Sequence, residues 1–189
     1  WSARRWEIPV RPFAIDRENP YQGRVRFFWS VAKPFIHEGV ACLFASKVGG
    51  FGEGFFTRSE GMLLASDNLA VETDPDRHRW ETLPRGEVGI RGPRGKIAEE
   101  HNGVPLGGSR IFCVYRTTDG FSGQAYSRDG GATWSTPAFM TYGPGERRCK
   151  NPRAANFVRR FSNGRFLYWF HNHGREGIYD GQPGGVPYQ

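Results

Sequence analysis

Short apolar or alternating runs recur along this chain, and each is bounded by Gly, Pro, Asn or Asp. Runs of this length, closed by turn-forming residues, are typical of β-strands joined by tight turns. A helical periodicity of 3.6 residues is hard to find, and the 26 glycines and 13 prolines agree with that reading. The sequence therefore predicts an all-β fold. The predicted strands are residues 26–31, 40–46, 62–66, 111–116, 123–127 and 165–171.

The predicted strands follow the same order more than once. In two units an apolar run, a Gly-containing turn and further short runs lead to a tryptophan, and Trp80 and Trp134 are 54 residues apart. A period of about 50 residues with four short strands per unit is typical of propeller blades. The predicted units span about 31–85, 95–142 and, incompletely, 150–189. Because a few blades alone leave open strand edges, we expect residues 1–189 to be about half of a larger ring.

One turn motif carries a family resemblance: Ser127-x-Asp129-x-Gly131-x-Thr133-Trp134. Ser and Asp side chains can cap backbone amides in such a turn, Gly supplies a positive φ, and Trp packs beneath it. The motif resembles the Asp box (or BNR repeat) of sialidase-type propellers, and residues from Ser66-Asp67 to Trp80 resemble a degenerate copy with an insertion of about ten residues. The resemblance implies a six-bladed β-propeller of sialidase type.

A Glu and an Arg flank the strands that precede this turn. Glu100 and Arg116 are 16 residues apart, and the Asp box begins 11 residues after Arg116. This arrangement is similar to one blade of the bacterial exo-sialidases. The resemblance implies that Glu100 is catalytic, as partner of a tyrosine nucleophile, and that Arg116 binds the substrate carboxylate. A planar guanidinium suits that task because it binds a carboxylate bidentately.

The sequence also departs from the family pattern. Lys33 stands where the first arginine of an early inner strand would be expected, no Asp can be assigned as acid/base, and the tyrosine and third arginine would be expected beyond residue 189. No cofactor or metal is predicted. The polar residues predicted to bind sugar beside the pocket are His101, Asn102, His171 and His173.

The formal net charge of +7 leaves two readings open. Its clusters are short, and they are either a solvated basic surface or a basic cleft for an anionic ligand. The clusters are Arg4-Arg5, Arg147-Arg148 with Lys150, and Arg159-Arg160. No run is typical of a nucleic-acid patch, and no stretch reaches the roughly 18 apolar residues of a membrane span. Cys42 and Cys113 lie in apolar runs and are expected to be buried thiols.

Two function classes follow. The first is a glycoside hydrolase of exo-sialidase type that releases terminal sialic acid or a similar acidic sugar from glycans. The second is a non-catalytic Asp-box propeller that binds glycans or protein partners through the same face. The oligomeric state and the compartment stay open, although a secreted or periplasmic location fits the family.

Overall fold

The computed structural model describes residues 6–52 and 54–172, and it confirms the all-β prediction. Most elements are antiparallel strands, and two short 3-10 helices, η1 (Ala14–Glu18) and η2 (Pro75–Arg77), accompany them. The strands are β1 (Phe27–Trp29), β2 (Phe35–His37), β3 (Val40–Gly52), β4 (Phe55–Ser66), β5 (Glu81–Leu83), β6 (Glu99–Gly107), β7 (Arg110–Arg116), β8 (Gly123–Ser127), β9 (Ala138–Phe139), β10 (Phe157–Arg160) and β11 (Phe166–Trp169).

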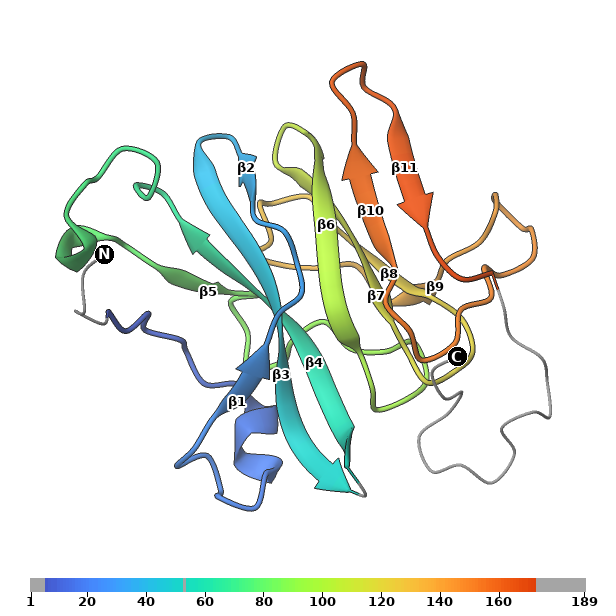
Figure 1. The fold of residues 1–189 in the computed structure, drawn as a ribbon, viewed down its shortest axis with the longest axis horizontal. Helices are drawn as coiled ribbons and strands as arrows, with labels where there is room; N and C mark the ends of the chain where they lie inside the picture. Colours follow the sequence, from blue (N-terminus) through green and yellow to red (C-terminus); the bar gives the residue numbers. More distant parts are fainter. Residues whose placement is uncertain (1–5, 53, 173–189) are drawn as a thin grey trace.

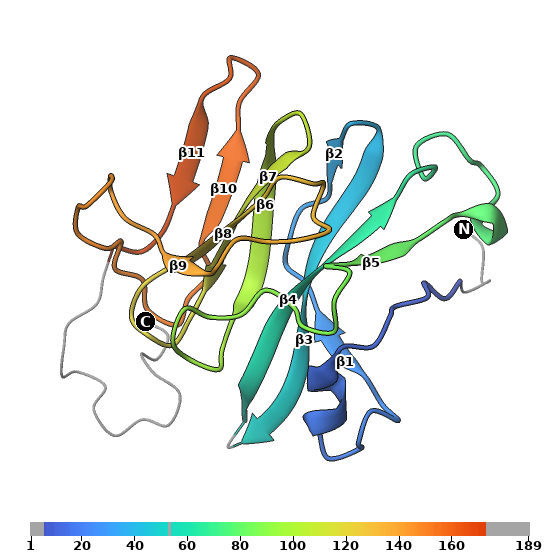
Figure 2. The ribbon, with the colours of Figure 1, turned by 180° about the vertical axis from the view of Figure 1, so that it is seen from behind.

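The strands form three sheets that lie side by side in chain order (Figures 1 and 2). The first sheet has the order β1-β3-β4-β5, with β2 also paired to β3; the second is β6-β7-β8-β9; the third is the hairpin β10-β11. The first strands of the three units are neighbours, since β6 contacts both β2 and β10. Among the described residues no sheet closes into a ring, so the propeller remains a prediction.

The four glycines of the segment 49–54 favour a flexible loop between strands. The structure differs, because β3 continues to Gly52 and β4 begins at Phe55. The register shifts on either side of Gly50, which is opposite Arg58. Such an irregularity bends and twists a hairpin, and the long hairpin extends well past the rest of its sheet (Figure 1).

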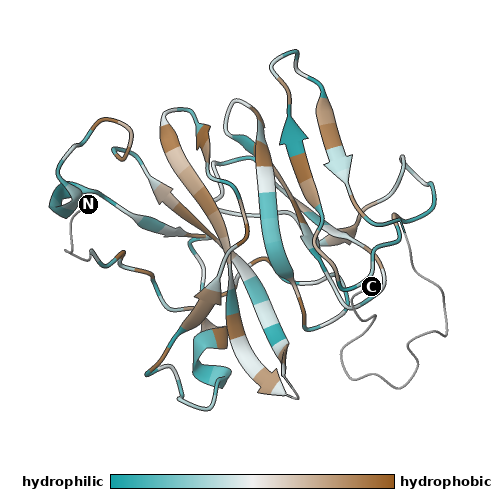
Figure 3. Ribbon diagram, in the orientation of Figure 1, coloured by the Kyte–Doolittle hydropathy of each residue, from teal (hydrophilic) through white to brown (hydrophobic). Residues whose placement is uncertain are grey.

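The first sheet is covered on both faces, as the alternation of side chains along β3 shows. Cys42 and Phe44 point into a core that the first sheet shares with the second. Leu43 and Ala45 point the other way, toward the N-terminal segment that contains η1. Successive residues of a strand face opposite sides of its sheet, so this strand reads as nearly continuously apolar (Figure 3).

The Asp-box turn between β8 and β9 has the geometry that its sequence predicts. Asp129 Oδ1 accepts hydrogen bonds from the Thr133 amide at 2.9 Å and the Ser127 hydroxyl at 2.8 Å. The Gly131 amide donates to Ser127 Oγ at 2.8 Å, and Gly131 has φ +97°. The Trp134 indole donates to the Gly131 carbonyl at 3.0 Å and packs against Phe44 of the first sheet. The turn therefore joins two strands and seals one sheet onto the previous one.

The degenerate copy between β4 and β5 keeps the same bonds with one change of residue. Asn68, not Asp67, takes the place of Asp129: its Oδ1 accepts from the Arg79 amide at 2.9 Å and faces Ser66 Oγ at 3.3 Å. Arg79 precedes Trp80 as Thr133 precedes Trp134. The copy is therefore seven residues longer than the intact turn, rather than about ten, and the extra length contains η2.

Candidate functional site: a buried Glu–Arg cluster

A buried ion pair joins the first two strands of the second sheet. Arg116, the last residue of β7, donates to Glu99 Oε2 from Nε at 2.9 Å and from Nη2 at 2.6 Å. The Arg116 side chain is 4% exposed and that of Glu99 is fully buried. Charge-assisted bonds of this length are among the strongest in proteins, so Glu99 fixes the orientation of the guanidinium.

Glu100 reaches the same guanidinium because the backbone is irregular at this point. Neighbouring side chains of a regular strand point to opposite faces, yet Glu100 Oε1 lies 3.3 Å from Arg116 Nη1. The pairing register shifts between Glu99 and Asn102, and Glu100 has φ +54°. A left-handed conformation at a residue other than glycine costs free energy, and such residues cluster at functional sites. The structure thus brings together the predicted pair, Glu100 and Arg116.

A second arginine completes the cluster. Arg153 Nη2 donates to the other oxygen of Glu99 at 3.3 Å and to the Phe56 carbonyl at 2.8 Å. Its guanidinium lies over the Phe55 ring, and that of Arg116 lies over the Trp29 ring. Two carboxylates and two guanidiniums therefore balance each other in a site with aromatic walls. We refer to Glu99, Glu100, Arg116 and Arg153 as the Glu–Arg cluster.

Burial sets the electrostatics of Glu100. Loss of solvation raises the pKa of this carboxyl above its ordinary value, and the neighbouring carboxylate of Glu99 adds to the effect, while Arg116 opposes it. Glu100 Oε2 is buried and has no hydrogen-bond partner within the described part of the chain. An acidic side chain with a raised pKa and an unused oxygen, 3.3 Å from a fixed guanidinium, is suited to proton transfer or to pairing with another polar group.

His101 was predicted to bind sugar, but the structure places it in the core. Its ring stacks on Tyr115 at 4.6 Å, and Nδ1 lies 3.0 Å from Ser46 Oγ. Burial lowers its pKa to about 3, so the imidazole is neutral at physiological pH. A Cβ atom on Gly61 would overlap this ring. His101 therefore packs the first sheet against the second, and it is 1% exposed.

Asn102, the next residue predicted to bind sugar, is buried and hydrogen-bonded within the fold. Its Nδ2 donates to the Asn156 carbonyl at 2.6 Å, and its Oδ1 accepts from the Val158 amide at 2.9 Å. These bonds attach β10 to β6 and occupy the side-chain amide. His171 is exposed just after β11, where its ring contacts Trp169. His173 lies outside the described residues.

Glu99 and Arg153 were missed by the sequence reasoning. The consecutive glutamates were a usable signal, because two buried carboxylates need more than one cation.

Cys42, Cys113 and Cys149 are buried free thiols, as expected for the first two. Within 6–52 and 54–172 no group of three potential metal ligands occurs, and no helix there is long and apolar enough to span a membrane.

Comparisons of the chain with protein-family models, with curated proteins and with solved structures gave no match.

Proposed function

We propose that this chain is part of a six-bladed sialidase-type propeller that hydrolyses glycosides of sialic acid or a similar acidic sugar. Support for the ring comes from the successive units, the two related turns and the contacts of β6 with β2 and β10. In such a ring these first strands face the axis, and the Glu–Arg cluster lies at one end of them, at the start of β6.

The observation that carries the enzymatic proposal is the backbone irregularity that turns Glu100 onto Arg116. A sialic acid has a carboxylate on its anomeric carbon, which repels a carboxylate nucleophile. Sialidases use a tyrosine instead, and a neighbouring glutamate can activate it as a base. Glu100 has the raised pKa and the unused oxygen that this role requires.

In this proposal Glu99 positions Arg116 and Glu100 acts on the reacting groups. Glu99 holds two nitrogens of the guanidinium at 2.9 and 2.6 Å, whereas Glu100 lies at the longer distance of 3.3 Å from Nη1. The substrate carboxylate takes the Nη1 edge, and Glu100 turns to the tyrosine hydroxyl. The tyrosine, the acid/base aspartate and the remaining arginines come from other parts of the ring.

The test is hydrolysis of a fluorogenic sialoside by the intact protein and by Glu100→Gln. The substitution keeps the shape of the side chain and removes the base, so kcat/KM should fall about 100-fold or more. Glu81→Gln is the matched control, because Glu81 is an exposed acid that pairs with the exposed Arg85, and it should leave turnover unchanged. Equal turnover by wild type and Glu100→Gln would refute the catalytic role.

The burial of the cluster favours the second candidate, a non-catalytic glycan-binding propeller. Glu99, Arg116 and Arg153 are each less than 5% exposed, as expected for charges that hold strands together. This alternative predicts saturable glycan binding without product release, and Glu100→Gln should leave the affinity unchanged. Release of free sugar by the wild-type protein decides between the two.

A further inference from the structure

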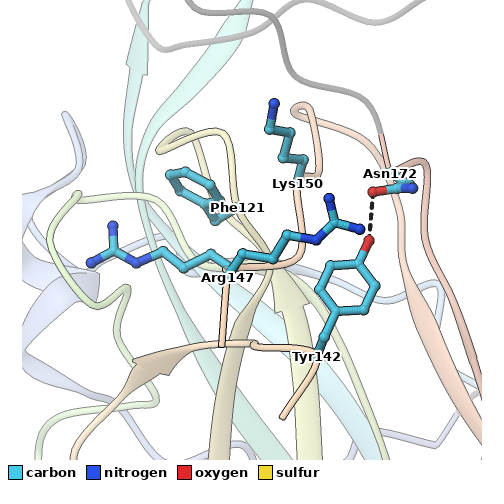
Figure 4. A pocket seen from close by; sticks show the side chains of 6 residues that line it. Phe121, Tyr142, Arg147, Lys150 and Asn172 are labelled. Carbon is cyan, nitrogen blue, oxygen red and sulfur yellow. Dashed lines mark hydrogen bonds between the residues drawn. The ribbon is translucent and has the colours of Figure 1, made fainter. Parts of the chain in front are cut away.

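A basic hollow lies beside the second sheet, between the loop after β7 and the segment that leads to β10. Its volume is about 210 Å³. Figure 4 shows Phe121 and Tyr142 on opposite sides of the hollow, with the Arg147 side chain extended toward Tyr142. We refer to it below as the basic hollow. Its lining residues are Phe121, Tyr142, Arg147, Arg148, Lys150 and Asn172.

Within residues 6–52 and 54–172, the three cations of the hollow have no carboxylate partner. None of the described carboxylates forms an ion pair with Arg147, Arg148 or Lys150, although many other arginines of the chain pair with Asp or Glu. Glu146 is next in sequence, but its amide donates a hydrogen bond to the Gly143 carbonyl and its carboxylate folds back beside Gly143 instead of pairing with a described cation. Like charges gathered without compensation create a positive potential that attracts anions.

Aromatic rings and backbone bridges hold these cations in place. The Arg147 guanidinium lies over the Tyr142 ring at 4.6 Å, and that of Arg148 lies over the Phe121 ring at 5.3 Å. A guanidinium over a ring keeps its N–H donors available at its edges. Lys150 pairs with Phe121 in an isolated β-bridge. The arrangement is therefore partly organised before any ligand binds, which lowers the entropic cost of binding.

The opposite wall supplies a polar pair. The Tyr142 hydroxyl donates to Asn172 Oδ1 at 2.6 Å, as Figure 4 shows. That bond leaves the Asn172 amide nitrogen, a donor, without a hydrogen-bond partner among the described residues, and a donor of this kind suits an oxyanion or a sugar hydroxyl. The hollow is smaller than the pockets of about 300–1,000 Å³ that take drug-sized ligands, so it fits one charged group with its sugar-sized carrier.

We propose that the basic hollow binds the oxyanion of an acidic saccharide, namely a carboxylate, sulfate or phosphate group. Arg147, Arg148 and Lys150 bind the anion, and Phe121 and Tyr142 give the carrier ring an apolar surface. The proposal is independent of hydrolysis at the Glu–Arg cluster, because it uses none of the residues of that cluster. It assigns a role to one of the basic clusters that the sequence left open between surface and cleft.

The test is titration of the intact, isotopically labelled protein with four sugars, followed by NMR and calorimetry. N-acetylneuraminic acid, N-acetylglucosamine 6-sulfate and glucose 6-phosphate carry the three kinds of anion, and N-acetylglucosamine is the neutral control. We expect saturable shifts of the amides of residues 147–150 with at least one anionic sugar, and the strongest of the three identifies the anion. Added salt should weaken this binding, since the site is exposed.

Substitutions locate the binding. Arg147→Gln and Arg148→Gln should each raise Kd about tenfold or more, because each removes a charged hydrogen-bond donor. Lys150→Gln should weaken binding in the same direction. Arg24→Gln is the matched control: Arg24 is exposed, forms no ion pair with the described residues, and its loss changes the net charge equally. Equal binding of the neutral sugar, an equal loss in Arg24→Gln, or no saturation by any anionic sugar at millimolar concentration would each overturn the proposal.

Discussion

The first and second sheets share a frame of antiparallel strands closed by related turns, and one equivalent position is neutral in the first sheet and charged in the second. The serine that begins each turn gives the alignment, because Ser66 pairs with Ala41 in the first sheet and Ser127 pairs with Ile111 in the second. Five residues further along the paired strand, the first sheet has Ser46 and the second has Arg116. The two turns and the closing tryptophans match; the residues at the far end of the second strand do not.

The difference shows that the frame itself does not need a charged cluster. Ser46 fills its position with a neutral hydrogen bond to His101, whereas Arg116 binds two glutamates. Buried ion pairs contribute little net stability, since desolvation offsets most of their attraction. A unit that folds with serine at this position therefore has no structural need for arginine there. The second sheet therefore carries the buried charges, and the first sheet has a neutral residue in their place.

The largest expected effect comes from making the second sheet neutral at that position. Among the described residues, Arg116→Met leaves the fully buried Glu99 with Arg153 as its one cationic partner, so the free energy of unfolding should fall by about 3–5 kcal/mol. Ser46→Ala removes one buried neutral hydrogen bond and should cost about 1–2 kcal/mol. Urea unfolding of the intact protein measures both.

A double variant shows whether the cost comes from the unpaired charge. Glu99→Gln combined with Arg116→Met removes both charges of the strongest pair, so it should be less destabilising than Arg116→Met alone. If the double variant is the less stable one, the cluster is a net source of stability, and the contrast between the two sheets loses its meaning.

Local patterns predicted the parts of the fold that depend on neighbouring residues. The strand periods, the Asp box and its degenerate copy all follow from residues close in sequence, and β7 and β8 lie within a residue of their predicted ranges. The cluster could be only half predicted. Strict alternation puts Glu99 and Glu100 on opposite faces, and nothing in the sequence signals the positive φ that overrides it.

Long-range contacts account for the other errors. Arg153 is 54 residues from Glu99 and belongs to no motif, so only the folded chain reveals their contact. His101 was assigned to the pocket because it is next to Glu100, but the shift in register directs it toward Tyr115 instead. The exposure of a polar side chain depends on the sheet that packs over it, and sequence periodicity does not contain that information.

The next effect, of intermediate size, compares the two turns. Asp129→Ala removes the acceptor of the Thr133 and Ser127 bonds and should lower the free energy of unfolding by about 1–2 kcal/mol. Asn68→Ala should cost about as much, because Asn68 forms the equivalent bonds. Asp129→Asn, which makes the intact turn resemble the degenerate one, should cost less than about 1 kcal/mol. Thermal unfolding of the three variants at neutral pH tests whether the turns are equivalent.

Low pH should affect the stability of the two turns differently. Partial burial opposes ionisation of Asp129, but the hydrogen bonds from Thr133 and Ser127 outweigh it and lower its pKa below the ordinary 3.8. The contribution of Asp129 is therefore complete above that value and is lost as the pH falls below it. The cost of Asp129→Ala should shrink in that range, while the cost of Asn68→Ala should not, because an amide does not titrate. Equal pH dependence of the two costs would contradict the assigned bonding.

The smallest expected effect on stability belongs to Glu100, the residue with the largest expected effect on activity. Its pKa is raised in the folded protein, so the native state binds more protons than the unfolded chain once the pH exceeds the ordinary value of 4.5. Stability then falls as the pH rises from 4.5 through the raised pKa, and above that the cost is complete. Glu100→Gln lacks this ionisation and keeps the same backbone. It should therefore be slightly more stable than the wild type at neutral pH, with the difference vanishing as the pH approaches 4.5 in parallel urea titrations. A variant that is less stable at neutral pH would mean that the attraction of Arg116 outweighs desolvation, and that Glu100 belongs to the frame as Ser46 does in the first sheet.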